Sequence, residues 1–412
     1  MDHTAPLATH SATTASDAIA VTDCHAEHET TWHIFCKVVD NYGDIGVCWR
    51  LACQLANRGK SVRLWVDDSS ALTWMAPAGH LNVTVMDCAH GLPKSVALKA
   101  TDIFIDTFGC EFAIDLIALQ AINTPPKAEF FDINKPNQLV WVNLEHLTAE
   151  SFAQRNHTLT YIRQGGKFAG WRQSYFYPGF IDKTGGLLRE MDLLLRQQVF
   201  DRREWLEHVL SVNQLKFDSH THYISLFCYE PEALHQLIEQ LTATTTPICL
   251  LVTAGRAKSA VKAVLEHQIR LNRAYSLPKL LSIVYLNPLT QTDYDHLLWS
   301  CDLNFVRGED SLVRAIWAGK PFIWQIYQQD DGVHHAKLDA FLQLLQAPES
   351  LQIAFRVWNA DSWRPISQSL PKELFNADWA SCVTSLRSKL LQQADLVTNL
   401  VEFCTKTSKI KV

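Results

Sequence analysis

The sequence predicts an α/β protein made of two doubly wound, Rossmann-like units that face a cleft. Apolar, β-branched runs of strand length alternate with segments of helical periodicity, first over residues 32–147 and again over residues 220–345. A chain of 412 residues is also longer than one ordinary core requires. Strands that alternate with helices usually pair in parallel and are covered by helices on both faces.

Composition and charge restrict the class of protein and its partners. Hydrophobic residues make up 47% of the chain and charged residues 19%, which is typical of a globular protein. The formal net charge of −6 gives no reason to expect binding to nucleic acid or to an anionic membrane. The 11 cysteines include no CxxC pair and no zinc-like spacing, so we expect free thiols, a reducing cytoplasmic location and no metal site.

The chain divides into four predicted parts. Residues 1–30 are rich in Thr, Ser, Ala and His and lack the basic start and apolar stretch of a signal peptide, so we expect a disordered tail. Residues 31–212 and 213–375 correspond to the two α/β units, and residues 376–412 to a final helix that packs back towards the first unit. No run of residues reaches membrane-spanning length.

The first unit begins with a strand, a short polar turn and a helix. Trp32–Val39 is apolar and β-branched, Asp40–Gly46 contains two glycines, and apolar residues from Val47 recur at helical spacing until Gly59 ends the helix. Residues 150–186 combine many aromatics and glycines with little periodicity, which indicates irregular surface structure. Further strands are predicted at 61–68, 81–88, 101–109 and 138–147, and helical segments at 72–75, 113–122, 186–199 and 202–212.

The second unit repeats this alternation. Its predicted strands are 220–230, 247–255, 279–287, 302–308 and 321–326, and its predicted helices are 231–243, 257–271, 291–300, 309–318 and 332–345. After an irregular stretch, residues 378–405 show one long amphipathic helical pattern.

The first candidate site is the turn that follows the opening strand. The first strand-to-helix turn at the carboxyl end of a parallel sheet is where α/β proteins place ligands. A loop that only turns the chain seldom contains two carboxylates, so we expect this loop to take part in a chemical reaction. The residues concerned are Asp40, Asn41, Tyr42, Gly43 and Asp44.

The second candidate site lies where the strand at 302–308 passes into the next helix. Arg307, a flexible Gly308, the hydroxyl of Ser311 and the free amides of a helix N-terminus suit a diphosphate. Glu309 and Asp310 would oppose that anion, and they fit a sugar hydroxyl, a ribose or a cationic acceptor better. Alternatively, the segment only caps the helix, since acids in the first turn stabilise a helix by about 0.3–1 kcal/mol.

Aromatic side chains near strand and helix ends are candidates for binding a base or a sugar. Their rings offer a stacking surface, and a nearby glutamine could hydrogen-bond to a pyrimidine edge. The alternative for each of them is a place in the core. The residues are Phe227, Tyr229, Gln291, Tyr294 and Tyr327.

Two adjacent histidines, His334 and His335, fall in the helix predicted at 332–345. Neither has a carboxylate or cysteine partner at metal-ligand spacing, so we interpret them as solvent-facing or capping residues.

Three long motifs resemble one known family. They are VVDNYGDIGVCWRLACQLA at 38–56, YPGF with KTGGLLRE at 177–190, and FVRGEDSLVRAIWAGKPFIWQIYQQDDGVHHAKL at 305–338. The chain from about residue 32 to its C-terminus resembles the EarP family, protein-arginine rhamnosyltransferases that modify and thereby activate bacterial translation elongation factor P. The resemblance implies a GT-B fold, a dTDP-β-L-rhamnose donor held mainly by the second unit, inversion at the sugar carbon, and neither a cofactor nor a metal.

The resemblance also implies roles for individual residues. The acids of the family's DNYGD turn correspond to Asp40 and Asp44, and its catalytic glutamate to Glu309. The donor contacts correspond to Phe227, Tyr229, Gln291, Arg307, Asp310 and Ser311, with Tyr294 and Tyr327 beside them.

The chemistry of an arginine acceptor limits what these acids can do. A guanidinium has a pKa above about 12 and a carboxylate a pKa near 4, so full deprotonation before attack would cost about 11 kcal/mol. We therefore expect the carboxylates to polarise the guanidinium and to take its proton late, as the carbon–nitrogen bond forms. Asp44 is the candidate base, Asp40 orients the acceptor or braces the loop, and Glu309 holds the guanidinium or the sugar from the opposite wall.

Three alternatives stay open from the sequence. The protein could transfer a nucleotide-activated sugar to a small molecule or a lipid, or it could be a sugar-nucleotide epimerase. A third alternative is a nucleotide-sensing module without enzymatic activity that docks on translation factors.

Overall fold

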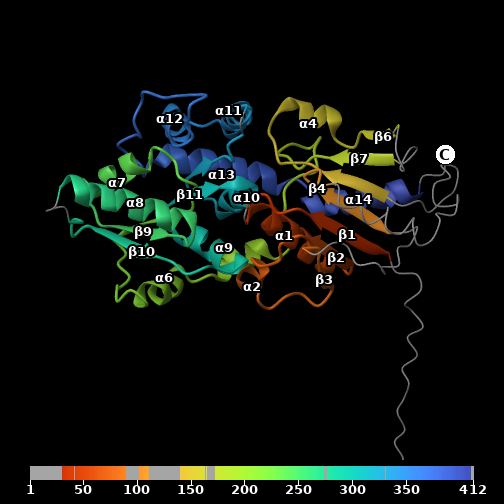
Figure 1. Ribbon diagram of the computed structural model, residues 1–412, viewed down its shortest axis with the longest axis horizontal. Helices are drawn as coiled ribbons and strands as arrows, with labels where there is room; N and C mark the ends of the chain where they lie inside the picture. The colour runs from red at the N-terminus through yellow and green to blue at the C-terminus, as the bar shows by residue number, and fades with distance from the viewer. Residues whose placement is uncertain are drawn as a thin grey trace, which may run out of the picture.

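The computed structural model describes residues 30–40, 42–89, 102–110, 140–162, 164, 172–272, 276–329 and 331–409. Two α/β units lie end to end along the long axis of the molecule (Figure 1). The predicted tail, except residue 30, the predicted helix at 113–122 and the candidate residue Asn41 lie outside the described residues.

The first unit is built on a seven-stranded sheet in which all pairings are parallel except that of β6 with β7. Its strands, in spatial order, are β3 (Val83–Asp87), β2 (Ser61–Val66), β1 (Thr31–Cys36), β4 (Ile103–Thr107), β5 (Val140–Leu144), β7 (Arg172–Phe176) and β6 (Thr160–Ile162). The described helices of this unit are α1 (Gly43–Asn57), α2 (Leu72–Met75) and α4 (Ser151–Asn156). Leu51 and Leu55 of α1 pack against Ile34 and Ile105 of the sheet in one buried cluster, which explains the helical apolar spacing.

The second unit is built on a five-stranded, fully parallel sheet. Its strands, in spatial order, are β10 (Leu281–Tyr285), β9 (Ile248–Val252), β8 (His222–Leu226), β11 (Leu303–Arg307) and β12 (Phe322–Gln325). The helices around it are α7 (Leu234–Thr242), α8 (Arg256–Leu271), α9 (Gln291–Ser300), α10 (Gly308–Ala318), α11 (His334–Leu345) and α12 (Glu349–Trp358). The alternation predicted from the sequence is confirmed in this unit, strand by strand.

Four local predictions were wrong. Residues 150–186 are not irregular throughout, because they contain α4, β6 and β7. The helix α12 lies in a stretch for which no element was predicted, and α1 begins at Gly43 rather than after Gly46. The pattern at 378–405 is two helices, α13 (Ala377–Leu391) and α14 (Leu396–Lys409), because the chain turns at residues 392–395.

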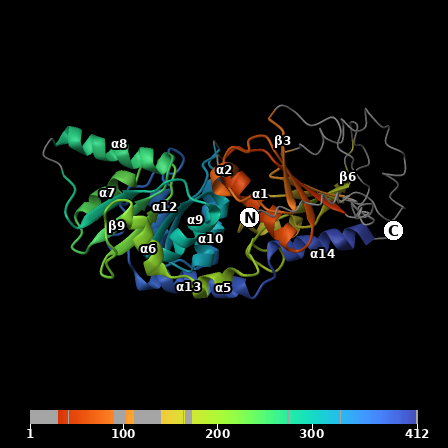
Figure 2. The same ribbon diagram turned by 90° about the horizontal axis from the view of Figure 1, so that it is seen from below.

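The two C-terminal helices pack on different units (Figure 2). Trp379 and Val383 of α13 belong to the core of the second unit, whereas Val397 and Leu400 of α14 belong to the core of the first. The chain therefore returns to the first unit at its end.

The helical part of the segment between the two sheets belongs by its packing to the second unit. It contains α5 (Leu193–Val199) and α6 (Arg202–Ser211), and Leu206 of α6 is buried against Tyr223 and Leu251 of the second sheet. The division predicted at residue 212 therefore does not follow the packing. Within the described residues, no helix is both long and apolar enough to cross a lipid bilayer.

The order of the strands sets where a ligand can bind. In each sheet the strands are added first on one side of the opening strand and then on the other. This change of side falls between β1 and β4 in the first unit and between β8 and β11 in the second, and both pairs are parallel. Crevices at such switch points open at the carboxyl ends of the strands. The helices α1 and α10 start at these two points, so both candidate sites of the sequence lie at a switch point.

Candidate active site

Two adjoining cavities lie between the units, and Asp40 and Gly43 line both of them. Both cavities are open to solvent, and the free space in and in front of them is about 840 Å³ for the first and about 1370 Å³ for the second. The predicted site residues that line the first cavity are Asp40, Tyr42, Gly43, Phe227, Gln291, Tyr294, Arg307, Asp310 and Ser311. Those that line the second cavity are Asp40, Gly43, Asp44, Gly308, Glu309 and Tyr327.

Asp40 lies at the junction of the two cavities and connects the two units. Its Oδ2 accepts a 2.6 Å hydrogen bond from the hydroxyl of Tyr229. A Cβ atom at Gly43 would lie 2.8 Å from this oxygen, and one at Gly308 would lie 3.1 Å from it. Gly308 also has a φ of +67°, so both its backbone and its surroundings require glycine. Burial, and then the Asp40 carboxylate, raise the pKa of Tyr229 far above its ordinary value, so its hydroxyl stays a donor.

Asp44 lies in the first turn of α1 and faces the second cavity. Its Oδ2 accepts hydrogen bonds from the backbone amides of Val39, at 2.8 Å, and Asp40, at 2.9 Å. Burial raises the pKa of this carboxyl group, although the two amide bonds act in the opposite direction. Asp44 thus stabilises the turn that contains Asp40. Its carboxylate also lines the second cavity.

Glu309 forms part of the opposite wall of the second cavity. Its carboxylate binds the Lys337 ammonium at 2.9 Å, Nδ1 of His146 at 3.2 Å and the backbone amide of Leu147 at 2.9 Å. Burial opposes ionisation of Glu309, but Lys337 and His146 outweigh it and lower its pKa to about 2. The side chain is therefore a fixed anion, held between α10, α11 and the loop after β5.

The anion-binding side of the first cavity is centred on Arg307. Its guanidinium carbon lies 4.5 Å from the ring centre of Phe227 and 4.2 Å from that of Tyr229. The backbone amides at the start of α10 follow directly, and helix N-termini favour negative charge. A buried cation held between two aromatic faces beside such a terminus suits a diphosphate.

The hydrogen bonds of Ser311 agree only in part with the prediction that its hydroxyl binds a diphosphate. Its Oγ accepts a 3.0 Å hydrogen bond from the backbone amide of Arg307 and donates to the carbonyl oxygen of the same residue. The hydroxyl lines the first cavity, but both of its bonds go to the backbone of Arg307 at the strand-to-helix junction.

The aromatic residues and the glutamine that were predicted to contact the donor do not all line the same cavity. The ring of Phe227 meets that of Tyr294 edge to face at 5.6 Å, and both line the first cavity. Tyr229 lines neither cavity and contacts Asp40 and Arg307 instead, while Tyr327 lines the second cavity. Gln291 lines the first cavity but donates its amide hydrogen to the backbone oxygen of Gly46 across the two units, at 2.9 Å.

Several cavity residues were missed from the sequence. Arg50 lies in a helix among apolar positions, and this contrast is the one signal that could have singled it out. The loops after β9 and β10 lie at carboxyl ends of parallel strands, where ligands bind, and could have been predicted on that ground. His146 and Lys337 carried no local signal, because their role depends on the distant Glu309. The loop residues concerned are Thr253, Ala254, Asn287, Pro288 and Leu289.

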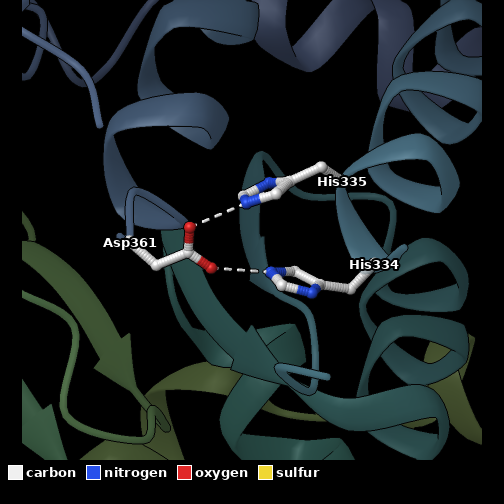
Figure 3. Close-up of side chains that lie close together, drawn as sticks. All are labelled: His334, His335 and Asp361. Atoms are coloured by element: carbon white, nitrogen blue, oxygen red, sulfur yellow. Dashed lines mark hydrogen bonds and ion pairs between the residues drawn. The ribbon is translucent and has the colours of Figure 1, made fainter. Parts of the chain in front are cut away.

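The interpretation of His334 and His335 as solvent-facing was wrong. Both are buried, and each Nε2 lies 2.9 Å from a different carboxylate oxygen of Asp361 (Figure 3). Nδ1 of His334 accepts the backbone amide hydrogen of Gln329, which places the ring proton on Nε2. These bonds brace the loop after β12. The ligand atoms of the same three side chains lie within 4.8 Å of one another, close enough to hold a metal ion, so the expectation that the histidines have no metal-ligand partner was also wrong.

The fold and the site together define a class of protein. Two Rossmann-like units flank a cavity lined by an arginine and a helix N-terminus that suit the phosphates of a nucleotide. A second cavity with three carboxylates, from Asp40, Asp44 and Glu309, adjoins it. This is the architecture of a GT-B glycosyltransferase.

Comparison with known proteins specifies the family. The family model described as "Elongation-Factor P (EF-P) rhamnosyltransferase EarP" matches residues 32–405. The protein-arginine rhamnosyltransferase of Pseudomonas putida is 37% identical over 400 residues, which cover 91% of this chain and 98% of the relative. That of Pseudomonas aeruginosa is 35% identical over 392 residues, covering 90% and 98%.

A solved structure supports the same assignment. The structure described as "Structural basis for EarP-mediated arginine glycosylation of translation elongation factor EF-P" is similar with a TM-score of 0.54 and 28% identity. The match covers 92% of this chain and 100% of that one. The chain belongs to the EarP family of protein-arginine rhamnosyltransferases.

Proposed function

We propose that this enzyme transfers L-rhamnose from dTDP-β-L-rhamnose to one arginine side chain of translation elongation factor P, with inversion at the sugar carbon, and thereby activates the factor. The observation that carries this proposal is the pair of cavities that meet at Asp40, one suited to a diphosphate and one lined by three carboxylates. The family description and that of the similar solved structure both name this acceptor. Such an activity belongs in the cytoplasm, where translation takes place.

The second cavity suits a guanidinium. Asp40, Asp44 and Glu309 approach it from both units and offer charge-assisted hydrogen bonds to a planar cation. The half-buried Asp44 has a raised pKa, which makes it a better proton acceptor than an ordinary aspartate. In the proposed reaction the guanidinium nitrogen attacks the sugar carbon, the bond to dTDP breaks, and Asp44 accepts the nitrogen's proton late in the step.

The first cavity would stabilise the leaving dTDP. Arg307 and the amides at the start of α10 carry the positive charge that the departing diphosphate needs. We propose that no metal ion or cofactor takes part. Transfer is accordingly expected to proceed at an unchanged rate after dialysis against EDTA, and a loss of activity that Mg²⁺ restores would contradict this.

Replacing Arg307 is expected to weaken the donor site strongly. Arg307→Ala removes the buried cation and should lower the affinity for dTDP by about 100-fold, measured by calorimetry. Ser311→Ala should lower it by less than about tenfold, because the hydroxyl already bonds to the backbone of Arg307. Arg202→Ala is the matched control, since Arg202 also lies over a tyrosine ring, that of Tyr223, but lines neither cavity. Unchanged affinity in Arg307→Ala would remove this residue from the phosphate site.

Mass measurement of the acceptor tests the proposal as a whole. The full-length enzyme is incubated with dTDP-β-L-rhamnose and elongation factor P, and the factor is then weighed and its modified residue located. One added deoxyhexose on an arginine is the expected result. Isomerised donor with unmodified factor would indicate an epimerase, and nucleotide binding without either reaction would indicate a sensor.

A further inference from the structure

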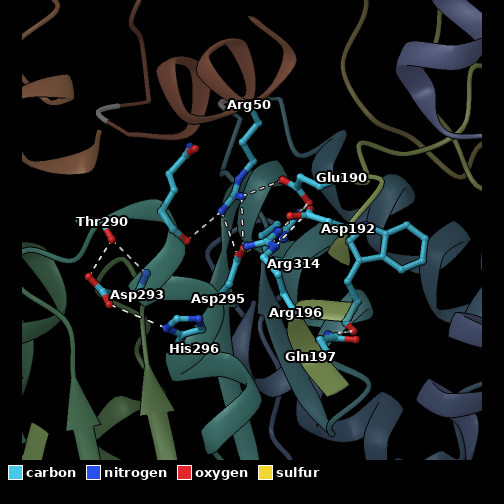
Figure 4. A network of polar contacts seen from close by, with 12 residues as sticks. Arg50, Glu190, Asp192, Arg196, Gln197, Thr290, Asp293, Asp295, His296 and Arg314 are labelled. Atoms are coloured by element: carbon cyan, nitrogen blue, oxygen red, sulfur yellow. Dashed lines mark hydrogen bonds and ion pairs between the residues drawn. The ribbon is translucent and has the colours of Figure 1, made fainter. Parts of the chain in front are cut away.

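The side chain of Arg50 extends from the first unit into the second, where acidic side chains surround it. It lies on α1, and its side chain is only 5% exposed. Its guanidinium contacts Asp310 at 3.1 Å, Asp295 at 3.0 Å and Glu190 at 3.2 Å (Figure 4 labels Arg50, Glu190 and Asp295). Arg314 of α10 binds the same Asp295, at 2.6 Å, and the same Glu190, at 2.7 Å. We call these five side chains the interdomain charge cluster.

The five N–H donors of Arg50 all have acceptors. Nε bonds to Asp310, Nη1 to Glu190 and Asp295, and Nη2 to Asp295 and to the backbone oxygen of Gln291. An arginine has five such donors, so none is left for a phosphate oxygen. Arg50 lines the first cavity, yet it can act on the reaction only through its partners.

The cluster joins the two helices that carry the proposed catalytic acids. Asp44 lies on α1, less than two turns before Arg50, and Glu309 is the neighbour of Asp310 on α10. The helices also approach closely at Gly46, where a Cβ would lie 3.6 Å from Oδ2 of Asp310. Because a helix is stiff over two turns, the Arg50–Asp310 pair sets the distance between the two acid-bearing helix ends.

We infer that Arg50 is a positioning residue that locks the two units in the reacting arrangement and holds Asp310 at the edge of the donor cavity. The inference rests on the proposed function for its activity readout. It assigns to Arg50 no contact with the donor or with the acceptor. This positioning role requires the planar guanidinium group of arginine, with its five donors. A lysine has the same charge but only three donors on a single nitrogen.

The test compares Arg50→Lys with Arg58→Lys. Arg58 lies on the same helix and also binds a distant segment, through Asp395 at 2.8 Å, but it lines neither cavity. Arg50→Lys should lower kcat by about 30-fold, while the Kd for dTDP stays within about threefold of the wild type. Arg58→Lys should leave both within about threefold. Small-angle scattering should show a larger radius of gyration for Arg50→Lys alone.

Two results would overturn the inference. A kcat of Arg50→Lys within threefold of Arg58→Lys would remove the positioning role, and a loss of dTDP affinity as large as the loss of kcat would contradict a role that leaves the donor site intact. If Arg50→Lys does not fold, as judged by circular dichroism, Asp310→Asn tests the same pair from the other unit, and scattering must then show the expansion. Where both variants fold, the double variant should be no slower than the slower single variant, and multiplied effects would also contradict the inference. Absence of transfer by the wild type would instead contradict the proposed function, and the scattering comparison would still test Arg50.

Discussion

Asp44→Asn is expected to lower the rate of rhamnose transfer by about 1,000-fold at saturating donor, within the range for loss of a general base. The asparagine keeps an oxygen that can accept the amides of Val39 and Asp40, so the turn should persist. It cannot accept the proton that the guanidinium nitrogen loses. Single-turnover transfer, followed by the mass of the acceptor, measures the chemical step directly.

Asp67→Asn is the matched control for this variant. Asp67 accepts the backbone amide of Val38, at 2.9 Å, as Asp44 accepts the next two amides, but it lines neither cavity. Its replacement should leave the transfer rate within about threefold of the wild type. Near-normal transfer by Asp44→Asn, with dTDP affinity intact, would refute the role of Asp44 as base.

The pH dependence of the transfer activity follows from the pKa of the Asp44 carboxyl group. Asp44 must be ionised to accept a proton, and burial raises its pKa above the value of about 4 that an ordinary aspartate has. Activity should therefore be full above the raised pKa and fall as the pH drops through it. The acidic limb of kcat/KM should thus lie higher than an exposed aspartate would give, and Asp44→Asn should lack it.

Glu309→Gln has the second largest expected effect. The amide oxygen can still accept the backbone amide of Leu147, but the negative charge that faces the acceptor cavity is lost. Removing one partner of a close charge pair typically costs 2–5 kcal/mol, so kcat/KM for the acceptor should fall by about 100-fold or more. Steady-state kinetics with elongation factor P as the varied substrate measure this fall.

Glu150→Gln serves as the control for Glu309→Gln. Glu150 lies in the same loop region as Leu147 and accepts a hydrogen bond from Thr148, but it lines neither cavity. It should leave kcat/KM for the acceptor unchanged, and neither variant should alter the affinity for dTDP. An unaltered kcat/KM in Glu309→Gln would show that Glu309 serves only to bind Lys337 and His146.

The local features of the fold could be predicted from the sequence. The strands of the second unit, the strands β1 to β5 of the first and the helix α1, which ends at Asn57 just before Gly59, follow from periodicity and turn residues, because these depend on neighbours along the chain. The strands β6 and β7 did not show such a pattern. The two loops that line the cavities could be located as well, since the turn at Asp40 and the junction at Arg307 each follow a buried strand. The helix α12 was missed because no alternation with a strand marks it.

The bonds inside the site could not be predicted, because they join residues far apart in the chain. His334 and His335 had no visible partner in sequence, since Asp361 follows 26 to 27 residues later and in an irregular segment. Gln291 fits a base by its chemistry, yet the structure uses its amide to join the two units.

The sequence by itself determined the alternation of strands and helices and the two loops that carry acids and an arginine, because periodicity and turn chemistry are local properties. Only the tertiary structure decided which of these residues meet. Tyr229 donates to Asp40 across 189 residues, and Arg50 binds Asp295 across 245. These contacts depend on how the two units pack together, and no spacing along the chain encodes that packing.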